Sequence, residues 1–230
     1  MLLKMKKDKN KEELKKENTT VLGFDSADTS HDEFLQLKKE MRGTGIKLMP
    51  LPNFVQTLRR IKDEDEIQLL REASKLGSEG YDYLLGLIKP GVTETELAKE
   101  LEIFWLRKGA RGVAFESIIA FGPNSSMPHY HPTPGVKLQN GQPVLIDIGV
   151  NDRHYNSDMT RVVFCGKASD EMKTIYEVVR VAQEKALAVC KAGVQIGDVD
   201  AVARDYIESQ GYGKNFTHNL GHGVGIEIHE

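Results

Sequence analysis

The sequence predicts an α+β fold with approximate two-fold symmetry, in which helices lie outside an antiparallel sheet. Two observations lead to this fold: an internal repeat, and a pair of apolar strands joined by a polar turn. Residues 88–115 match residues 190–216 at an offset of 102, and the matched pairs include Gly91 with Gly193, Val92 with Val194, and Gly109 with Gly211. Each copy predicts a turn, a helix, a glycine and an apolar strand, and an amphipathic helix precedes each copy. Two such units favour a layered α+β domain.

Residues 1–55 are predicted to hold a lysine-rich lead-in and the remnant of an N-terminal domain. The first 19 residues combine many lysines with few apolar side chains, which is typical of a solvated helical segment. Two short apolar runs, TVLGF and IKLMPL, flank a helical pattern that ends at a glycine. This β-α-β piece is too small to be a domain by itself.

Residues 56–230 form the predicted main domain, and its first part is predicted to be a helical linker. Within residues 55–88, apolar side chains recur at the spacing of a helix face: Ile67, Leu70, Ala73 and Leu76. Further along, Thr93 and Glu96 have the spacing of a capping box. We therefore expect the second helix of the first repeat copy to begin just after Thr93.

The composition is that of an ordinary globular protein. With 40% hydrophobic residues, 28% charged residues and a net charge of −3, it gives no reason to expect nucleic acid or a membrane surface as a partner. The two cysteines, Cys165 and Cys190, are too few for a disulfide framework and favour a reducing compartment. Neither a long apolar run nor an apolar N-terminal signal is present, so we expect a cytoplasmic protein.

The predicted hairpin carries one aspartate in each strand. Asp147 lies within the strand PVLIDIGV, Asp158 at the start of SDMTRVVFC, and NDRH forms the turn. A turn centred on Asp152 and Arg153 would place Asp147 directly opposite Asp158 on one face. Opposed Cβ atoms then lie about 4.5–5.5 Å apart. Two ionised carboxylates at that spacing repel each other and lose hydration.

Three arrangements would relieve this repulsion. One carboxyl could remain protonated, Arg153 or Arg161 could neutralise the pair, or divalent metal ions could bind between the two groups. The histidines favour the metal: all but one lie at or after His129, and His222 is flanked by glycines in HNLGHGVG. Aspartate together with histidine suits Mn²⁺, Co²⁺, Fe²⁺ or Zn²⁺ better than Ca²⁺.

Four stretches together resemble the pita-bread metallopeptidases: GPNSSMPHYHPT, VLIDIG, NSDMTRVV and FTHNLGHGVGIEIHE. They match most closely the branch of aminopeptidase P and prolidase, enzymes that cleave Xaa-Pro bonds. The resemblance covers roughly residues 56–230, with a weaker match over residues 20–55. It implies a metal-dependent exopeptidase that removes the residue before proline from peptides with proline at the second position, and a homodimer as the family expectation.

The resemblance also implies roles for particular residues. Asp147 would be a bidentate ligand of one metal, Asp158 the ligand that bridges both, and His222 a ligand of the second. His129 would lie near the scissile carbonyl, His229 would assist proton transfer, and His218 would line the substrate pocket. Thr160 would hold the bridging carboxylate or the water from outside the metal shell. The cofactor would be two divalent ions, Mn²⁺ first, with Co²⁺ or Zn²⁺ as alternatives. A hydroxide shared by the two ions would attack the carbonyl.

The sequence departs from the family at two ligands. The family site has five ligands, and the last two are glutamates on C-terminal strands, one of them in a TIEPG-like motif that also supplies the general base. Neither motif occurs here, and Glu227 and Glu230 match neither position. We therefore expect this chain as written to lack activity and the sheet to lack its last strands. The alternative is a non-catalytic pita-bread domain that serves as a binding or assembly module.

Overall fold

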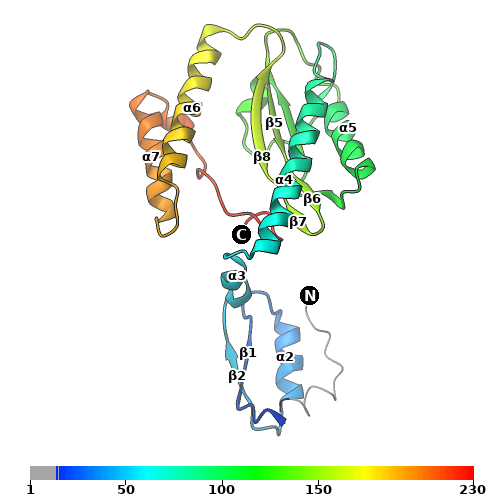
Figure 1. Ribbon diagram of the computed structural model, residues 1–230, viewed down its shortest axis with the longest axis vertical. Coiled ribbons are helices and arrows are strands. Elements are labelled where there is room, and N and C mark those ends of the chain that lie inside the picture. Colours follow the sequence, from blue (N-terminus) through cyan, green and yellow to red (C-terminus); the bar gives the residue numbers. More distant parts are fainter. Residues whose placement is uncertain (1–13, 15) are drawn as a thin grey trace. The chain divides into compact units, whose positions relative to one another are not determined.

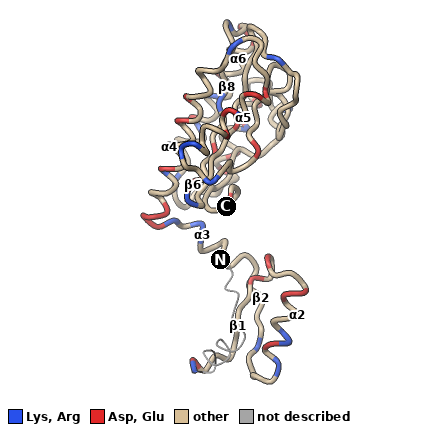
Figure 2. Tube along the Cα trace, turned by 90° about the vertical axis from the view of Figure 1, so that its right-hand side faces the viewer, with Lys and Arg blue, Asp and Glu red and all other residues tan. Residues whose placement is uncertain are grey.

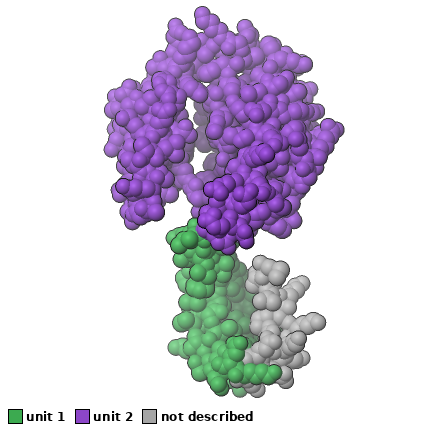
Figure 3. Space-filling model, viewed as in Figure 1, with its two compact units in different colours: residues 1–61 green, residues 62–230 purple. Residues whose placement is uncertain are grey.

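The computed structural model describes residue 14 and residues 16–230, and the chain divides into two compact units, residues 1–61 and 62–230 (Figure 3). Most of the predicted lysine-rich lead-in lies in residues 1–13 and 15, outside the described residues. The prediction that residues 1–55 are the remnant of a domain stays a prediction.

The first unit contains the predicted β-α-β piece. Strands β1 (Val21–Phe24) and β2 (Lys47–Pro50) pair in parallel, and helix α2 (His31–Glu40) connects them. A capping box formed by Ser30 and Glu33 begins α2, and the ring of Phe34 stacks on that of Phe24 at 5.2 Å. The helix therefore packs on the two-stranded sheet through an aromatic contact. A short helix, α3 (Phe54–Arg59), follows β2.

The single helical linker predicted over residues 55–88 is wrong, because two helices occupy this stretch. Helix α3 ends at Arg59, and α4 (Glu64–Leu85) begins after Asp63. The Asp63 carboxylate accepts a hydrogen bond from the Glu66 backbone N–H (2.9 Å), and the Glu66 carboxylate accepts one from the Asp63 N–H (2.8 Å). This capping box starts a new helix. Helix α4 also buries Ala73 and Leu84 completely, so it is a core helix of the second unit.

The internal repeat is confirmed by matching helix ends. Helix α5 (Glu94–Arg107) follows α4, and α7 (Ile196–Ser209) follows α6 (Asp170–Val189). Gly109 and Gly211, which end the second helix of each copy, have φ of 92° and 86°. The next backbone N–H groups donate to Trp105 and Ile207, in each case over 3.1 Å. The left-handed glycines and the backbone hydrogen bonds that follow them are related by the same offset of 102 residues. Both copies therefore end this helix with the same type of C-cap.

The two copies differ after this cap. The first continues into strands β3 (Gly112–Val113) and β4 (Ile118–Phe121). The second continues into a short 3₁₀ turn, η2 (Gly213–Asn215), and the described residues beyond it form no strand, so the apolar strand expected there is wrong. In this glycine-rich segment, the backbone carbonyl of Ile226 accepts a hydrogen bond from the Asn156 side chain, through Nδ2.

The strands of the second unit form two three-stranded sheets (Figure 1). Their pairing is antiparallel, as the sequence predicts. One sheet has the order β3-β6-β7, with β6 (Val150–Asp152) and β7 (Tyr155–Asn156). The other has the order β4-β5-β8, with β5 (Pro143–Ile148) and β8 (Met159–Phe164). A 3₁₀ turn, η1 (Gly122–Ser126), follows β4. Helices α4 and α5 pack against these strands around the fully buried Trp105.

Helices α6 and α7 form a separate hydrophobic cluster. Their contact buries Val178, Ala182 and Ala203, and none of these residues belongs to the cluster around Trp105. Figure 3 shows the second unit hollowed between these helices and the rest of the unit. Charged residues of both signs are interspersed along the chain (Figure 2), and no described helix is long and apolar enough to cross a membrane.

Strand β8 leads to a prediction about self-association. Among the described strands it pairs only with β5, so its outer edge presents unpaired backbone groups that can template pairing with another chain. We expect the protein to self-associate in a concentration-dependent manner, and Val162→Lys on this edge to reduce it, as measured by sedimentation velocity. Val179→Lys, which adds the same charge on an exposed position of α6, is the matched control. Wild-type protein that stays monomeric, or equal effects of both variants, would count against a β8 interface.

Candidate metal centre

The hairpin turn sets the position of the two aspartates. Arg153 and His154 occupy the turn with φ of 46° and 75°, as the two central residues of a two-residue hairpin loop require. The predicted centre at Asp152 and Arg153 is therefore off by one residue. Asp147 lies opposite Thr160, not opposite Asp158 as predicted. A shift by two positions along one strand keeps the same face, so Asp158 remains on the face of Asp147 and lies diagonally from it.

Gly149 allows the strands to approach closely beside Asp158. A Cβ at Gly149 would collide with the Ser157 carbonyl oxygen and with the ring of Phe115. The Ser157 N–H donates to the Val150 carbonyl (2.9 Å), while the Val150 N–H donates to Ser157 Oγ (3.1 Å). In a regular antiparallel sheet the Val150 N–H would donate to a backbone carbonyl of the neighbouring strand. Here the hydroxyl of Ser157 accepts this hydrogen bond instead. The sheet is interrupted here, directly before Asp158.

Thr160 supports a different aspartate from the one predicted. Its hydroxyl donates to Asp147 Oδ1 (2.8 Å), because the register places these two residues opposite each other. Of the two predicted roles of Thr160, holding the bridging carboxylate Asp158 is therefore wrong, and holding the water stays a prediction. The contact instead orients Asp147, whose half-buried side chain projects from the same face of the sheet.

The environment disfavours ionisation of both carboxyls. Burial raises the pKa of Asp147, and the charge of Asp158 raises it further, while Thr160, His129 and His222 act in the opposite direction. Burial also raises the pKa of Asp158, against the positive charges of His222 and His229. The histidines therefore offset burial only in part, and a further cation beside the two carboxyls would favour the ionised form of both.

Neither arginine considered as a neutralising partner serves the pair. Arg153 forms ion pairs with Glu72 and Asp152. Arg161 Nη1 donates to the carbonyl of Thr160 over 2.8 Å. No arginine contributes to the pKa shift of either Asp147 or Asp158. This leaves a proton or a metal ion as the compensation.

His222 presents one ring nitrogen to Asp158. Its Nδ1 donates to the Gly223 carbonyl over 2.8 Å, and its Nε2 lies 3.3 Å from Asp158 Oδ2. Because a carbonyl only accepts, Nδ1 carries the proton, and the Nε2 of a neutral ring then turns its lone pair toward the carboxylate. Lone pairs that face each other require a cation or a second proton between them. Two ligands bound to one ion at about 2.0–2.2 Å have a comparable separation, so the pair fits a shared metal.

The other predicted histidines lie in different surroundings. The ring of His229 packs edge-on against His222 at 4.1 Å. His129 is exposed with φ of 55°, close enough to Asp147 for its charge to lower the pKa of that carboxyl. His218 lies beside α7, where its carbonyl accepts from Arg204 over 2.9 Å and its ring packs against Phe216.

The structure thus brings together Asp147, Asp158, His222, His229 and His129, while the contacts of His218 are with the α7 region. Within residues 14 and 16–230, no three His, Cys, Asp or Glu side chains converge closely enough to form a metal site. The donor set is therefore a close pair, Asp158 and His222, with Asp147 diagonal to it. The predicted roles of all these residues stay predictions.

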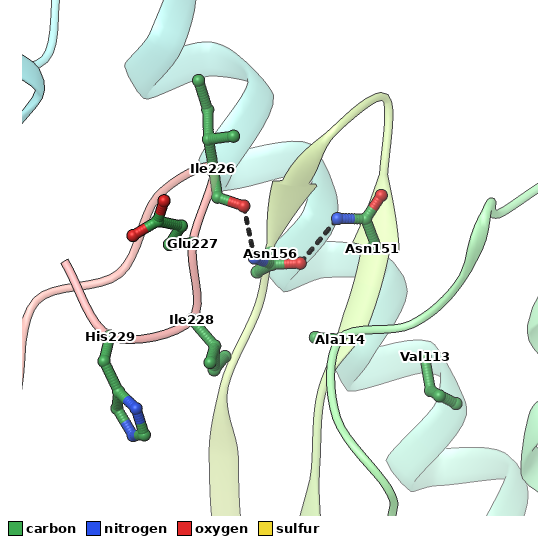
Figure 4. Close-up of a pocket in the computed structure, with 8 residues that line it drawn as sticks. All are labelled: Val113, Ala114, Asn151, Asn156, Ile226, Glu227, Ile228 and His229. Atoms are coloured by element: carbon green, nitrogen blue, oxygen red, sulfur yellow. Dashed lines mark hydrogen bonds between the residues drawn. The ribbon is translucent and has the colours of Figure 1, made fainter. Parts of the chain in front are cut away.

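A shallow groove of about 440 Å³ adjoins this region and shares only His229 with the predicted site (Figure 4). Its lining residues are Val113, Ala114, Asn151, Asn156, Ile226, Glu227, Ile228 and His229. Asn156 Nδ2 donates to the Ile226 carbonyl (2.9 Å), and the Asn156 N–H donates to the Gly225 carbonyl (2.9 Å). Asn156 therefore fixes the segment that carries His229 to the β6-β7 hairpin.

Sequence reasoning missed two positions that shape the site. Asn156 lies between the predicted turn and the predicted second strand and has no predicted role, although its amide fixes the His229 segment. Glu94 also has no predicted role, yet its side chain is fully buried. In the sequence, an acidic residue directly after an N-cap threonine looks the same whether its carboxylate is buried or solvated.

The repeated helix pairs, the antiparallel sheets and the Asp-His cluster define the pita-bread class of metallopeptidases. Residues 68–230 match metallopeptidase family M24, and the chain belongs to this family. It is 39% identical over 184 residues to the uncharacterised peptidase YqhT of Bacillus subtilis, covering 80% of this chain and 52% of YqhT. It is 38% identical over 180 residues to a Xaa-Pro dipeptidase of Pyrococcus horikoshii, covering 76% and 50%.

Solved structures show the same relationship. The chain superposes on a Xaa-Pro dipeptidase from Bacillus anthracis with a TM-score of 0.89 at 34% identity, covering 99% of this chain and 63% of that one. For an X-Pro aminopeptidase from Thermotoga maritima the TM-score is 0.90 at 33% identity, covering 100% and 64%. The fold and the family are thus established. The chain spans about half the length of the curated relatives it matches.

Proposed function

We propose that this chain carries part of the active site of a metal-dependent exopeptidase that removes the N-terminal residue before proline. The observation that carries the proposal is the orientation of His222: its Nδ1 is bonded to the Gly223 carbonyl, and its Nε2 lies 3.3 Å from Asp158 Oδ2, on the sheet face that also carries Asp147. The similarity to proteins named as Xaa-Pro dipeptidase and X-Pro aminopeptidase supports the substrate class, peptides with proline at the second position. A homodimer is part of the same proposal.

Three residues would hold the metal ions: Asp147, Asp158 and His222. Family M24 is metal-dependent, and we propose two Mn²⁺ ions, with Co²⁺ or Zn²⁺ as alternatives. When bound, such ions lower the pKa of a coordinated water and polarise a carbonyl oxygen. The chain contributes the orientation: the Gly223 carbonyl fixes the tautomer of His222, and Thr160 fixes the rotamer of Asp147.

The histidines outside the ligand set would act on the substrate. His129, which is near Asp147 and open to solvent, would donate a hydrogen bond to the oxygen on which negative charge develops. His229 would pass a proton between the site and the substrate, since its ring contacts His222 and borders the groove. His218 would line the pocket for the peptide.

Hydrolysis of Xaa-Pro peptides tests the proposal directly. In a form of the protein that also supplies the two glutamate ligands, we expect Mn²⁺-dependent release of the first residue from Ala-Pro or Ala-Pro-Ala. His129→Gln should lower kcat of that form by about 10²-fold or more, the size typical of removing an oxyanion donor. His131→Gln is the matched control, because His131 pairs with Glu116 at 2.8 Å. Absence of turnover with any divalent metal would reject the activity for this chain.

A second function is a non-catalytic binding or assembly module. One observation favours it for this chain: among the described residues no three donors converge on one point. Calorimetry separates the two functions. Metal binding together with turnover supports the peptidase, whereas a folded chain that neither binds Mn²⁺ nor hydrolyses the peptides supports the module.

A further inference from the structure

We propose that Glu94 is a positioning residue: its buried carboxylate holds the loop that carries His129 in place beside the β5 strand. The contacts of Glu94 do not depend on the proposed function. Only the catalytic meaning of His129 rests on it.

Glu94 is the first residue of α5 and is completely buried. Its Oε1 accepts hydrogen bonds from the backbone N–H of Phe121 (2.8 Å) and from Asn124 Nδ2 (3.0 Å). Its Oε2 accepts from the Tyr130 hydroxyl (2.7 Å) and from the backbone N–H of Thr133 (3.1 Å). Four donors therefore converge on one carboxylate, and burial makes each bond expensive to lose.

These four donors lie on both sides of His129 in the chain. Phe121 ends strand β4 and Asn124 lies in the turn η1, both before His129, whereas Tyr130 and Thr133 follow it. Asn124 Nδ2 also donates to the Tyr130 hydroxyl over 2.8 Å, which ties the two sides to each other. The loop is thus closed around the Glu94 carboxylate, and His129 projects from it into solvent.

The backbone of His129 needs this support. Its φ of 55° is in the left-handed region, which is unfavourable for a residue other than glycine. Such conformations persist where neighbouring contacts determine them. Tyr130, the next residue, is held by Glu94, and Pro128, the preceding residue, has a restricted φ of its own.

A solvent-exposed acidic residue at the start of a helix has a different role from that of Glu94, because it caps the helix locally. Glu96, two residues later in α5, has local hydrogen-bond partners: its carboxylate accepts from the N–H and hydroxyl of Thr93 and forms the capping box. Glu94 instead reaches residues 27 to 39 positions away in sequence. All its partners are donors, so a glutamine at this position would direct an amide N–H₂ at donors.

The test compares Glu94→Gln with Glu96→Gln in the full chain by NMR. In Glu94→Gln we expect amide hydrogen exchange at Phe121 and Thr133 to accelerate about tenfold or more, the ratio that corresponds to losing one hydrogen bond to a charged group. We also expect the imidazole ¹⁵N resonances of His129 to shift. Those of His154, on the β6-β7 turn and bonded to Arg111, should not. Glu96→Gln should leave His129 unchanged.

Each other outcome decides against the proposal. Unchanged His129 resonances despite faster exchange would show that Glu94 holds the loop but not the histidine. Equal shifts at His129 and His154 would show a general loss of structure. If Glu94→Gln does not fold, Tyr130→Phe removes one contact and must still shift His129. Because these measurements need neither metal nor substrate, a shifted His129 in a protein without peptidase activity would reject the proposed function and leave the role of Glu94 intact.

Discussion

Asp158→Asn is expected to abolish binding of two divalent ions in calorimetric titrations with Mn²⁺. Asp158 Oδ2 lies 3.3 Å from His222 Nε2, and Asp158 shares a face of the sheet with Asp147. An amide keeps the shape of the side chain but removes the charge that holds a cation. Asp152→Asn is the matched control, because Asp152 pairs with Arg153 in the turn. Two ions bound to Asp158→Asn would refute the ligand assignment.

The same substitution is expected to raise stability when metal is absent. Burial raises the pKa of Asp158 above its ordinary value of 3.8, so the folded state binds this proton more tightly than the unfolded chain. Its contribution to stability is therefore present at low pH and is lost as pH rises above about 4. At pH 7 in EDTA, Asp158→Asn should melt at a higher temperature than the wild type, and the difference should shrink toward pH 4.

Metal should reverse this order. An ion that binds only the folded state stabilises it by about 2.7 kcal/mol at a concentration 100-fold above its Kd. With excess Mn²⁺ at pH 7 the wild type should therefore melt above Asp158→Asn. A variant that is less stable than the wild type in EDTA at pH 7 would show that the carboxylate of Asp158 is satisfied by the protein alone.

Gly149→Ala is expected to destabilise the fold by about 1–3 kcal/mol, the range of overpacked core positions. The added methyl group would collide with the Ser157 carbonyl and with Phe115, and it would lie 3.1 Å from Ala114 Cβ. Relief requires the two strands to separate where Ser157 leads into Asp158. Urea denaturation measures the loss of stability, and weaker Mn²⁺ binding is expected with it.

Gly197→Ala is the matched control for this substitution. Gly197 lies in the first turn of α7, without a left-handed φ, and no atom lies within 4 Å of the added Cβ. We expect it to be neutral or to stabilise the protein by about 0.5–1 kcal/mol, since alanine loses less entropy than glycine in a helix. A Gly149→Ala protein as stable as Gly197→Ala would show that the strands can separate there without loss.

Local sequence patterns predicted the starts and ends of helices correctly where a residue type favours one particular backbone structure. Gly109 and Gly211 end matched helices because only glycine takes the left-handed C-cap without strain. Thr93 and Glu96 form the expected capping box. The same reasoning failed between Arg59 and Asp63, where helical periodicity on both sides concealed the end of one helix and the start of another.

The hairpin marks the boundary between sequence and structure most clearly. NDRH identifies a turn, but left-handed conformations at Arg153 and His154 are not encoded by residue type, because neither is a glycine or asparagine. Contacts of Arg153 with Glu72 and of His154 with Arg111 lie far away in the chain. These long-range contacts are consistent with the strand register that places Thr160 opposite Asp147. No local sequence pattern predicts that register.

The sequence by itself determined the family, the alternation that puts Asp147 and Asp158 on one face, and the glycine-flanked His222. These are properties of short segments, where periodicity and residue type act directly on the backbone. Only the tertiary structure decided that His222 directs Nε2 at Asp158, that Thr160 supports Asp147, and that Glu94 closes the loop around His129. Each of these depends on which distant groups burial brings within hydrogen-bond distance, and that is a property of the packed chain.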